Sequence, residues 1–431
     1  MKRLALQSLI HWKSKASRKP LIVRGARQVG KTWLMKHFGE LHFEQTVYLN
    51  FERQPHLKGL FDQSMNPQDL IRAIETDSNA SITPGRTLLI FDEIQECPKA
   101  ITALKYFYEE AADYHILAAG SLLGVALHQS VSFPVGKVSF LDLHPMNFEE
   151  FLLALGHDQL CEALNRLNYP LLTALHDKLS RLLRSYYVVG GMPEAVLHFA
   201  ASERFDEVRE IQQALLLTYE QDFSTHAPAA VVSRIRMVWN SVLSQLAQER
   251  RKFVYAHIKE GARAKDFEMA LAWLTDCGQV RKVHAITKPH LPLKAYEDLS
   301  AFKLFLHDVG LLGAMGNLPV KTLLQGSTVF TEFKGALTEQ FVCQELTAVP
   351  DLSLYYWSAK KGAAEVDFVV QKEEDIIPVE VKAEENLKAK SLLVYQERYQ
   401  PRIALRTSLS VHKTSDWLHN IPLYAIGFRF K

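Results

Sequence analysis

The chain has 431 residues, of which 48% are hydrophobic and 23% charged, and its formal net charge is only +2. At about 150 residues per domain, this describes a globular protein of roughly two to four domains and excludes a disordered or polybasic chain. The four cysteines lie far apart, which excludes a zinc cluster built on short Cys spacing and a disulfide framework. No apolar run reaches the ~18 residues of a membrane span, so we expect a cytoplasmic protein with no membrane partner.

The first informative stretch is residues 21–32, an apolar strand followed by Gly-x-x-x-x-Gly-Lys-Thr. Between a strand and a helix, this pattern is typical of a P-loop. Its backbone N–H groups and the N-terminus of the next helix would hold the phosphates of ATP. We expect Lys31 to reach the β- and γ-phosphates and Thr32 to bind Mg²⁺. The predicted ATP-binding residues are Gly25, Ala26, Arg27, Gln28, Val29, Gly30, Lys31 and Thr32.

The run from Gly85 to Glu96 predicts a buried parallel strand that ends in Asp92 and Glu93. After a P-loop, two carboxylates at a strand end indicate a phosphate site, where Asp92 would hold Mg²⁺ and Glu93 would polarise the attacking water. The next predicted strand ends in Ser121, whose hydroxyl would either sense the γ-phosphate or cap a helix.

Strands and helices alternate up to residue 143, which predicts an α/β fold with a doubly wound parallel sheet. Asn50 ends another strand of this sheet, at the edge where ligands bind, although a solvated strand end is the simpler interpretation. After Pro145, apolar residues recur at helical spacing to about residue 224, and we assign this region no chemistry. Within it, Gly190 to Pro193 predicts a tight turn followed by a new helix.

Residues 226–300 are basic, with 12 Lys and Arg against 7 Asp and Glu, a net charge of +5. Predicted helices at Arg234–Ala247 and Lys265–Asp276 precede a strand at Val280–Ile286, an order that suggests a winged helix. A solvated basic face on a packing module explains the charge equally well. The side chains that would meet DNA phosphates are Arg263, Lys265, Arg281 and Lys282. The pair that follows, His307–Asp308, predicts a turn or a helix cap.

The last segment contains a second possible site, formed by Glu339, Asp367, Glu380 and Lys382. Period-2 alternation places Glu380 and Lys382 on one face of a strand, beside Asp367 on the neighbouring strand. Two carboxylates and a lysine in this order are typical of a restriction-endonuclease-like Mg²⁺ site, with Glu339 as a helix-borne fourth member. Residues 331–431 carry 13 basic and 14 acidic residues, so charge gives no sign of a nucleic-acid groove and an inert version stays open.

Together these motifs resemble the prokaryotic AAA-type ATPases that join an N-terminal P-loop domain to a C-terminal domain of unknown function with a restriction-endonuclease-like core. The resemblance covers nearly the whole chain and implies a winged-helix-like middle part. In one departure, Gly136–Lys137 stands where the group often has Gly-Arg. If that arginine acts as an arginine finger on the nucleotide of a neighbouring subunit, Lys137 would do so less well, because lysine lacks the planar guanidinium group. The matching segments are Arg24–Thr32, Phe91–Gln95, Ala119–Ser121, Gly190–Glu194, His307–Leu311 and Glu365–Lys382.

These observations predict a Mg²⁺-dependent ATPase that couples hydrolysis to a conformational change of a DNA-associated C-terminal region. The alternative is a nucleotide-dependent switch, with an inert nuclease-like domain, that binds a protein partner. A homo-oligomer fits either hypothesis. Glu93 beside the Mg²⁺ ligand favours attack by water and argues against a kinase. The predicted domains are an ATPase domain (1–145), a helical lid or connector (146–225), a winged-helix-like basic module (226–315) and a restriction-endonuclease-like domain (316–431).

Overall fold

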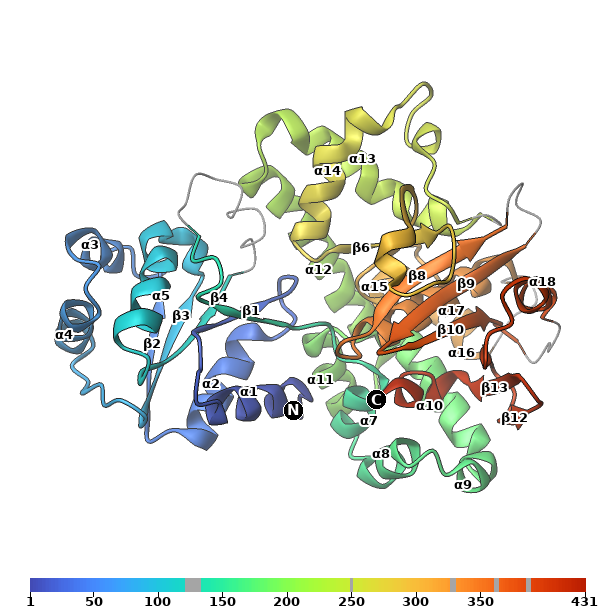
Figure 1. Ribbon diagram of the computed structural model, residues 1–431, viewed down its shortest axis with the longest axis horizontal. Helices are drawn as coiled ribbons and strands as arrows, with labels where there is room; N and C mark the ends of the chain where they lie inside the picture. Colours follow the sequence, from blue (N-terminus) through green and yellow to red (C-terminus); the bar gives the residue numbers. More distant parts are fainter. Residues whose placement is uncertain (121–132, 249–250, 326–330, 360–363, 385–388) are drawn as a thin grey trace. The chain divides into compact units, whose positions relative to one another are not determined.

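The computed structural model describes the chain except residues 121–132, 249–250, 326–330, 360–363 and 385–388 (Figure 1). Ser121 therefore lies outside the described residues. The chain divides into two compact units. The N-terminal unit comprises Lys2–His144 with Asp276–Gln279, and the C-terminal unit comprises Pro145–Thr275 and Val280–Lys431 together with Met1.

The N-terminal unit contains a five-stranded sheet in the order β2-β3-β4-β1-β5, in which every pairing is parallel (Figure 1). This confirms the predicted parallel α/β sheet. Its strands are β1 (Leu21–Arg24), β2 (Gln45–Asn50), β3 (Thr87–Asp92), β4 (His115–Ala119) and β5 (Ser139–Asp142). Its helices are α1 (Ala5–Ser14), α2 (Lys31–His42), α3 (Leu57–Gln63), α4 (Pro67–Ser78), η1 (Ile94–Glu96) and α5 (Pro98–Glu110).

The position of β3 in the core of the N-terminal unit explains why its sequence is almost entirely apolar. All six residues of β3 are buried, as expected for a central strand of a parallel sheet. Phe91 of β3 packs edge-on against the rings of Phe51, Phe61 and Phe107, at centroid distances of 5.8–6.3 Å. Burial of each such ring stabilises the fold by about 1.5–3 kcal/mol, which holds the end of β3 in place.

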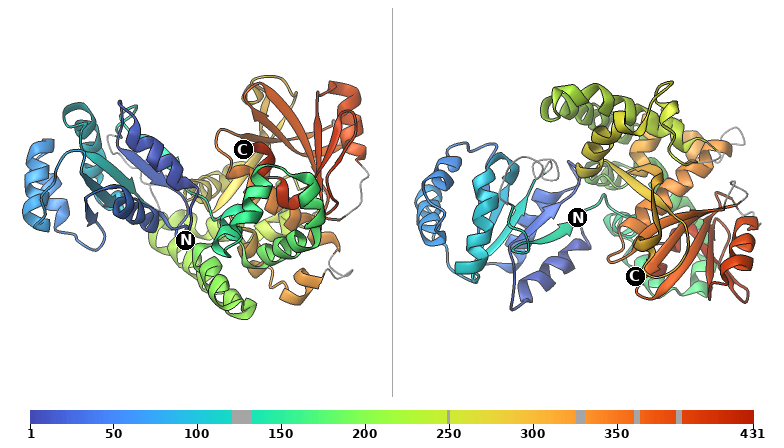
Figure 2. Two further views of the ribbon diagram at one scale, coloured as in Figure 1. Left: turned by 90° about the horizontal axis from the view of Figure 1, so that it is seen from below. Right: turned by 45° about the horizontal axis from the view of Figure 1, so that its top comes forward.

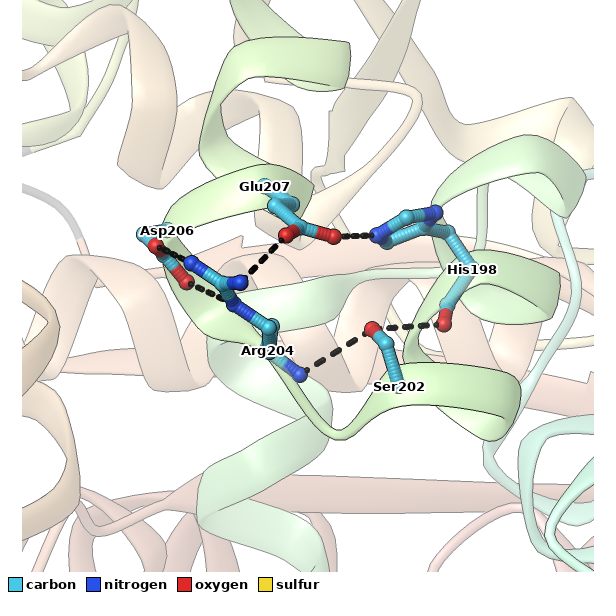
Figure 3. Close-up of polar contacts among 5 residues, drawn as sticks. All are labelled: His198, Ser202, Arg204, Asp206 and Glu207. Carbon is cyan, nitrogen blue, oxygen red and sulfur yellow. Dashed lines mark hydrogen bonds and ion pairs between the residues drawn. The ribbon is translucent and has the colours of Figure 1, made fainter.

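The C-terminal unit begins with helices, as the sequence predicts. They are α7 (Phe148–Ala154), α8 (Asp158–Asn165), α9 (Tyr169–Ala174), α10 (His176–Val189), α11 (Pro193–Ser202), α12 (Phe205–His226), α13 (Ala229–Leu246), η2 (Tyr255–His257) and α14 (Ala264–Asp276). Figure 3 shows the turn between α11 and α12, where Arg204 pairs with Asp206 and Glu207, and Glu207 also contacts His198. Arg204 and Asp206 are exposed to solvent, so these ion pairs contribute little to stability.

The rest of the C-terminal unit is built on an eight-stranded mixed sheet in the order β12-β13-β11-β10-β9-β8-β6-β7. Helix α18 packs along β9 and β10 (Figure 2). The strands are β6 (Val280–Ile286), β7 (Glu297–Leu306), β8 (Ser353–Ser358), β9 (Glu365–Lys372), β10 (Asp375–Val381), β11 (Ala404–Ser408), β12 (Lys413–Thr414) and β13 (Leu418–Pro422). The helices are η3 (Leu293–Tyr296), α15 (Val309–Met315), α16 (Val320–Gln325), α17 (Thr331–Thr347), α18 (Lys390–Tyr399), η6 (Leu423–Ala425) and η7 (Phe428–Phe430).

This sheet crosses the boundary that we predicted at residue 315. Strands β6 and β7 form an antiparallel pair, and β6 also pairs in parallel with β8, Ala285 with Tyr356 and Ile286 with Trp357. The strands after α14 are therefore part of the same sheet as the C-terminal strands. No helix in the described part of the chain is long and apolar enough to cross a membrane.

Candidate functional site

The loop between β1 and α2 has the backbone that a P-loop needs. Gly25 has φ +147°, and a Cβ there would lie 2.1 Å from the carbonyl oxygen of Leu143. Gly30 has φ +92° and is the left-handed residue directly before α2. A Cβ would clash with Leu143 at position 25 and would disfavour the left-handed backbone at position 30, so the loop requires glycine at both positions. They direct the chain into α2 so that the N-terminus of this helix faces the loop.

Lys31 is the first residue of α2, and its side chain turns back into the loop. Its Nζ atom donates hydrogen bonds to the carbonyl oxygens of Gly25, at 2.9 Å, and Ala26, at 2.8 Å. Burial lowers the pKa of Lys31 to about 8, while the negative charges of Glu93 and Asp92 act in the opposite direction. The loop thus holds a cation that gains from an anionic ligand, because phosphate oxygens would compensate its lost hydration.

Asp92 ends β3 and lies at the centre of a hydrogen-bonded group. Its Oδ2 atom accepts from the hydroxyl groups of Thr32 and Tyr48, each at 2.7 Å. Asn50 Nδ2 donates to the Tyr48 hydroxyl oxygen at 3.0 Å. Thr32 and Asp92 supply the oxygen ligands that Mg²⁺ prefers, and only 2.7 Å separates their oxygens, so these residues fit the ion.

Glu93 follows Asp92 with a left-handed backbone, φ +49° and ψ +46°. Its backbone N–H donates to Asp92 Oδ1 at 3.1 Å, and its Oε2 atom accepts from Gln95 Nε2 at 2.7 Å. Through this hydrogen bond, Gln95 orients the carboxylate that we expect to act on water. A left-handed backbone at a residue other than glycine is strained, and such strained residues are concentrated at functional sites.

Tyr48 is the member of this group that the sequence analysis missed. It lies two residues before Asn50 on β2, and Asn50 is paired in register with Asp92 on β3. Burial raises the pKa of Tyr48 to about 12, so the hydroxyl stays protonated and donates to the carboxylate. The period-2 spacing from Asn50 was the available signal, since residues i and i+2 share a face of a strand.

The other predicted residues of the N-terminal unit are less central. Lys137, at the position of the expected finger, pairs with Glu109 at 2.9 Å. Both side chains of this pair are more than 30% exposed, and ion pairs at the protein surface contribute little to stability. Gln28 has φ +63°, which places a second left-handed residue within the loop.

The structure brings the four predicted residues of the C-terminal site onto neighbouring elements. Glu339 lies on α17, Asp367 on β9, Glu380 on β10 and Lys382 directly after β10. Lys382 Nζ pairs with Glu380 Oε1 at 2.6 Å, and Asp367 Oδ2 accepts from the backbone N–H of Val381 at 2.8 Å. The expected common face of Glu380 and Lys382 agrees with this contact.

The basic side chains predicted to meet DNA lie at two places. Arg263 and Lys265 are exposed at the start of α14, whereas Arg281 and Lys282 are partly buried on β6. Lys282 Nζ also lies 5.0 Å from the centroid of the Phe302 ring, a cation–π contact within the unit. Only the first pair is therefore fully available to a ligand.

Comparison with known families divides the chain into three matched segments. Residues 17–152 match an AAA domain. Residues 180–322 match a domain of unknown function (DUF8612), and residues 334–426 match another (DUF4143). With the P-loop geometry, the first match establishes that the N-terminal unit has an AAA-type P-loop fold. No curated protein matches the chain.

Among solved structures, the chain is similar to the Walker-type ATPase PABY2304 of Pyrococcus abyssi, with a TM-score of 0.45, 12% identity and coverage of 73% of this chain and 95% of that one. It is also similar to the Aeropyrum pernix ORC2 protein, with a TM-score of 0.40, 13% identity and coverage of 80% and 95%. A third similar structure is the Aeropyrum pernix ORC1 protein in complex with DNA, with a TM-score of 0.28, 12% identity and coverage of 74% and 92%. At these values the likeness does not identify a function.

Proposed function

We propose that this protein is a Mg²⁺-dependent ATPase. The observation that carries the proposal is the group formed by Lys31, Thr32, Asp92 and Glu93, since it supplies the cation, the metal ligands and the base that hydrolysis requires. Residues 25–32 would bind the phosphates of ATP, with Lys31 on the β- and γ-phosphates. Glu93, held by Gln95, would orient and polarise the attacking water, and Ser121 would sense the γ-phosphate.

The magnesium ion would be held by Thr32 and Asp92. When bound, it supplies positive charge to the phosphate oxygens on which negative charge develops. Tyr48 and Asn50 would fix the orientation of the Asp92 carboxylate from its other side. Residue groups that orient a metal ligand in this way affect metal affinity without touching the ion.

We further propose that hydrolysis is coupled to a conformational change of a DNA-associated C-terminal region. In this proposal residues 146–225 are a lid or connector, residues 226–315 contact DNA through Arg263 and Lys265, and residues 316–431 are restriction-endonuclease-like. A homo-oligomer in which a neighbour completes the ATP site fits the exposed position of Lys137. The net charge of +5 in residues 226–300 supports the DNA partner.

The test is ATP hydrolysis with and without duplex DNA, together with oligomer size with and without nucleotide. The proposal expects Mg²⁺-dependent turnover that rises with DNA, and DNA affinity that falls steeply with salt. An Arg263→Glu, Lys265→Glu variant should lose the response to DNA but retain basal turnover. Absence of turnover in every condition would contradict the ATPase, whereas turnover indifferent to DNA would contradict only the coupling.

A second candidate is a nucleotide-dependent switch that binds a protein partner and carries an inert nuclease-like domain. One observation favours it: the ammonium group of Lys303 lies among the carboxylates of the C-terminal cluster. This candidate expects nucleotide-dependent binding of a protein and no effect of DNA on turnover.

A further inference from the structure

The carboxylate cluster of the C-terminal unit contains more charge than its four predicted members suggest. Glu365, at the start of β9, joins Glu339, Asp367 and Glu380, so that four carboxylates lie together. Glu339 and Glu380 are each only 3% exposed. Several buried carboxylates at one place are highly unfavourable unless cations compensate them.

Lys303 of β7 supplies the central compensating charge. Its side chain is completely buried, and its Nζ atom lies 2.6 Å from Glu365 Oε1, 3.5 Å from Glu339 Oε2 and 3.8 Å from Asp367 Oδ1. Oxygens of three carboxylates thus surround one ammonium nitrogen. Carboxylates surround a bound metal ion in a similar way, but here the contacts are ion pairs at longer distances.

Arg251 adds a second, partly buried cation to the same cluster. Its guanidinium contacts the other carboxylate oxygen of Glu339 and is 15% exposed. Both cations come from the sequence before residue 315, and their backbones are close, since Lys252 forms a β-bridge with Lys303. The cluster therefore joins β7 and the segment before η2 to β9 and α17.

Two further oxygens of the cluster also have partners, whereas Glu380 Oε2 is buried and has no hydrogen-bond partner among the described residues. Asp367 Oδ2 accepts from the backbone N–H of Val381, and Glu380 Oε1 pairs with Lys382. Lys382, which in a nuclease would act on water, is thus held by a carboxylate. Within the described ranges, no group of three or more His, Cys, Asp or Glu side chains is arranged to hold a metal ion.

We propose that the Lys303 ammonium is an internal cation that occupies the place of the divalent ion in the restriction-endonuclease-like cluster of this chain. The cluster then serves as a buried network of ion pairs that links β7 to β9, and it does not cleave nucleic acids. Mg²⁺ requires oxygens at about 2.0–2.1 Å, and the ammonium fills the space that these ligands would enclose. This inference does not depend on ATP hydrolysis by the N-terminal unit.

The experiment measures Mn²⁺ binding to the full chain without nucleotide, by electron paramagnetic resonance, for wild type, Lys303→Met and Lys303→Arg. Methionine keeps an unbranched side chain of similar length but removes its charge, whereas arginine retains a cation. We expect Lys303→Met to bind one Mn²⁺ with an affinity at least about tenfold above that of wild type, because the carboxylates lose their counter-charge. Adding Asp367→Asn should abolish this site, and Lys303→Arg should not acquire it.

Two results would overturn the proposal. The first is a nucleotide-independent Mn²⁺ site in wild type that Asp367→Asn removes, or Mg²⁺-dependent DNA nicking by wild type that the same substitution removes. The second is a folded Lys303→Met variant, with wild-type circular dichroism, that acquires no Mn²⁺ site. Since the first result needs only wild type and Asp367→Asn, the proposal can be tested even if Lys303→Met does not fold.

Discussion

The carboxylate of Asp308 accepts a hydrogen bond at 2.6 Å from the backbone N–H of Gly191, which is 117 positions earlier in the chain. Its other oxygen accepts from the N–H of Leu311 at 2.9 Å and caps α15. Two motifs that the sequence offers without a function, Gly190 to Pro193 and His307–Asp308, are thus parts of one buried contact. The turn expected at Gly190 to Pro193 and the cap expected at Asp308 are both confirmed.

We expect Gly191→Ala to destabilise the C-terminal unit by about 1–3 kcal/mol. A Cβ at Gly191 would lie 1.9 Å from the carbonyl oxygen of Met146, so the turn would have to move away from Asp308. Chemical denaturation followed by fluorescence measures the loss. Gly313→Ala is the matched control. A Cβ at this position in α15 would meet only ordinary contacts, with Arg209 at 3.8 Å and Leu323 at 3.9 Å, so the substitution should be neutral or slightly stabilising. Equal effects of the two substitutions would contradict this explanation.

Replacing Lys31 by alanine should weaken ATP binding by at least about 100-fold, because the β- and γ-phosphates lose their buried cation. Fluorescent-nucleotide titration measures the affinity. Lys99→Ala removes an exposed lysine of the same unit, which pairs with Asp62 at 2.9 Å, and should bind ATP as wild type does. Retention of affinity by Lys31→Ala would show that the loop does not hold the phosphates.

Glu93→Gln should leave ATP binding intact but slow hydrolysis by about 10²–10⁴-fold, the usual contribution of a general base. Phosphate release under saturating ATP measures the rate. Glu96→Gln, three residues further on, changes a partly exposed carboxylate that pairs with Lys58 at 3.4 Å and should have no effect. If both variants hydrolyse ATP equally fast, another group must orient the water.

Tyr48→Phe should raise the Mg²⁺ concentration needed for half-maximal turnover by about tenfold, because Asp92 loses one of the donors that orient it. The measurement is the Mg²⁺ concentration for half-maximal activity at saturating ATP. Tyr114→Phe removes a hydroxyl from another half-buried tyrosine of this unit and serves as the control. A Tyr48→Phe variant with lower maximal rate and unchanged Mg²⁺ dependence would assign Tyr48 a different part in the site.

The buried Glu345 predicts a loss of stability as pH rises. Burial raises the pKa of its carboxyl to about 8, although Oε1 accepts from the N–H of Phe148 at 2.8 Å. The folded protein therefore keeps a proton that the unfolded chain releases, so this contribution is complete below the unfolded pKa and is lost as pH rises toward about 8. The decrease is at most about 1.4 kcal/mol per pH unit for one group.

Glu345→Gln should remove this part of the pH dependence, since glutamine keeps the acceptor but carries no proton to lose. Denaturation of wild type and variant at about pH 6 and about pH 9 gives the comparison, and the variant should be relatively more stable at the higher pH. Parallel pH profiles for the two proteins would mean that Glu345 is charged in the folded state.

The sequence predicted the elements that have strong local signals. The apolar run of β3, the helical spacing of α14 and the strand Val280–Ile286 all depend on neighbouring residues, and they agree with the structure. Two elements have no bounds in the sequence analysis for local reasons. Strand β7 begins with the polar residues Glu297 and Asp298, which carry no apolar strand signal. Helix α15 is short, and its only clear local signal is its cap, Asp308.

The parts that escaped the sequence analysis depend on pairs of residues far apart in the chain. Tyr48 belongs to the nucleotide site only because β2 pairs in register with β3. Lys303 enters the carboxylate cluster only because β7 and β9 belong to one sheet, and a lysine in an apolar strand carries no signal of this. The roles assigned to the P-loop residues, Asp92 and Glu93, and those of the C-terminal cluster, stay predictions until the experiments above are done.

The pairing of β6 with β8 limits how this protein can have been assembled in evolution. The two matched segments 180–322 and 334–426 look like separable modules, yet Ala285 and Ile286 in the first form backbone bridges with Tyr356 and Trp357 in the second. A genetic exchange or truncation between them would leave β8 with an unpaired edge, which invites association with other chains. The two segments are therefore expected to be inherited together, as one heritable unit.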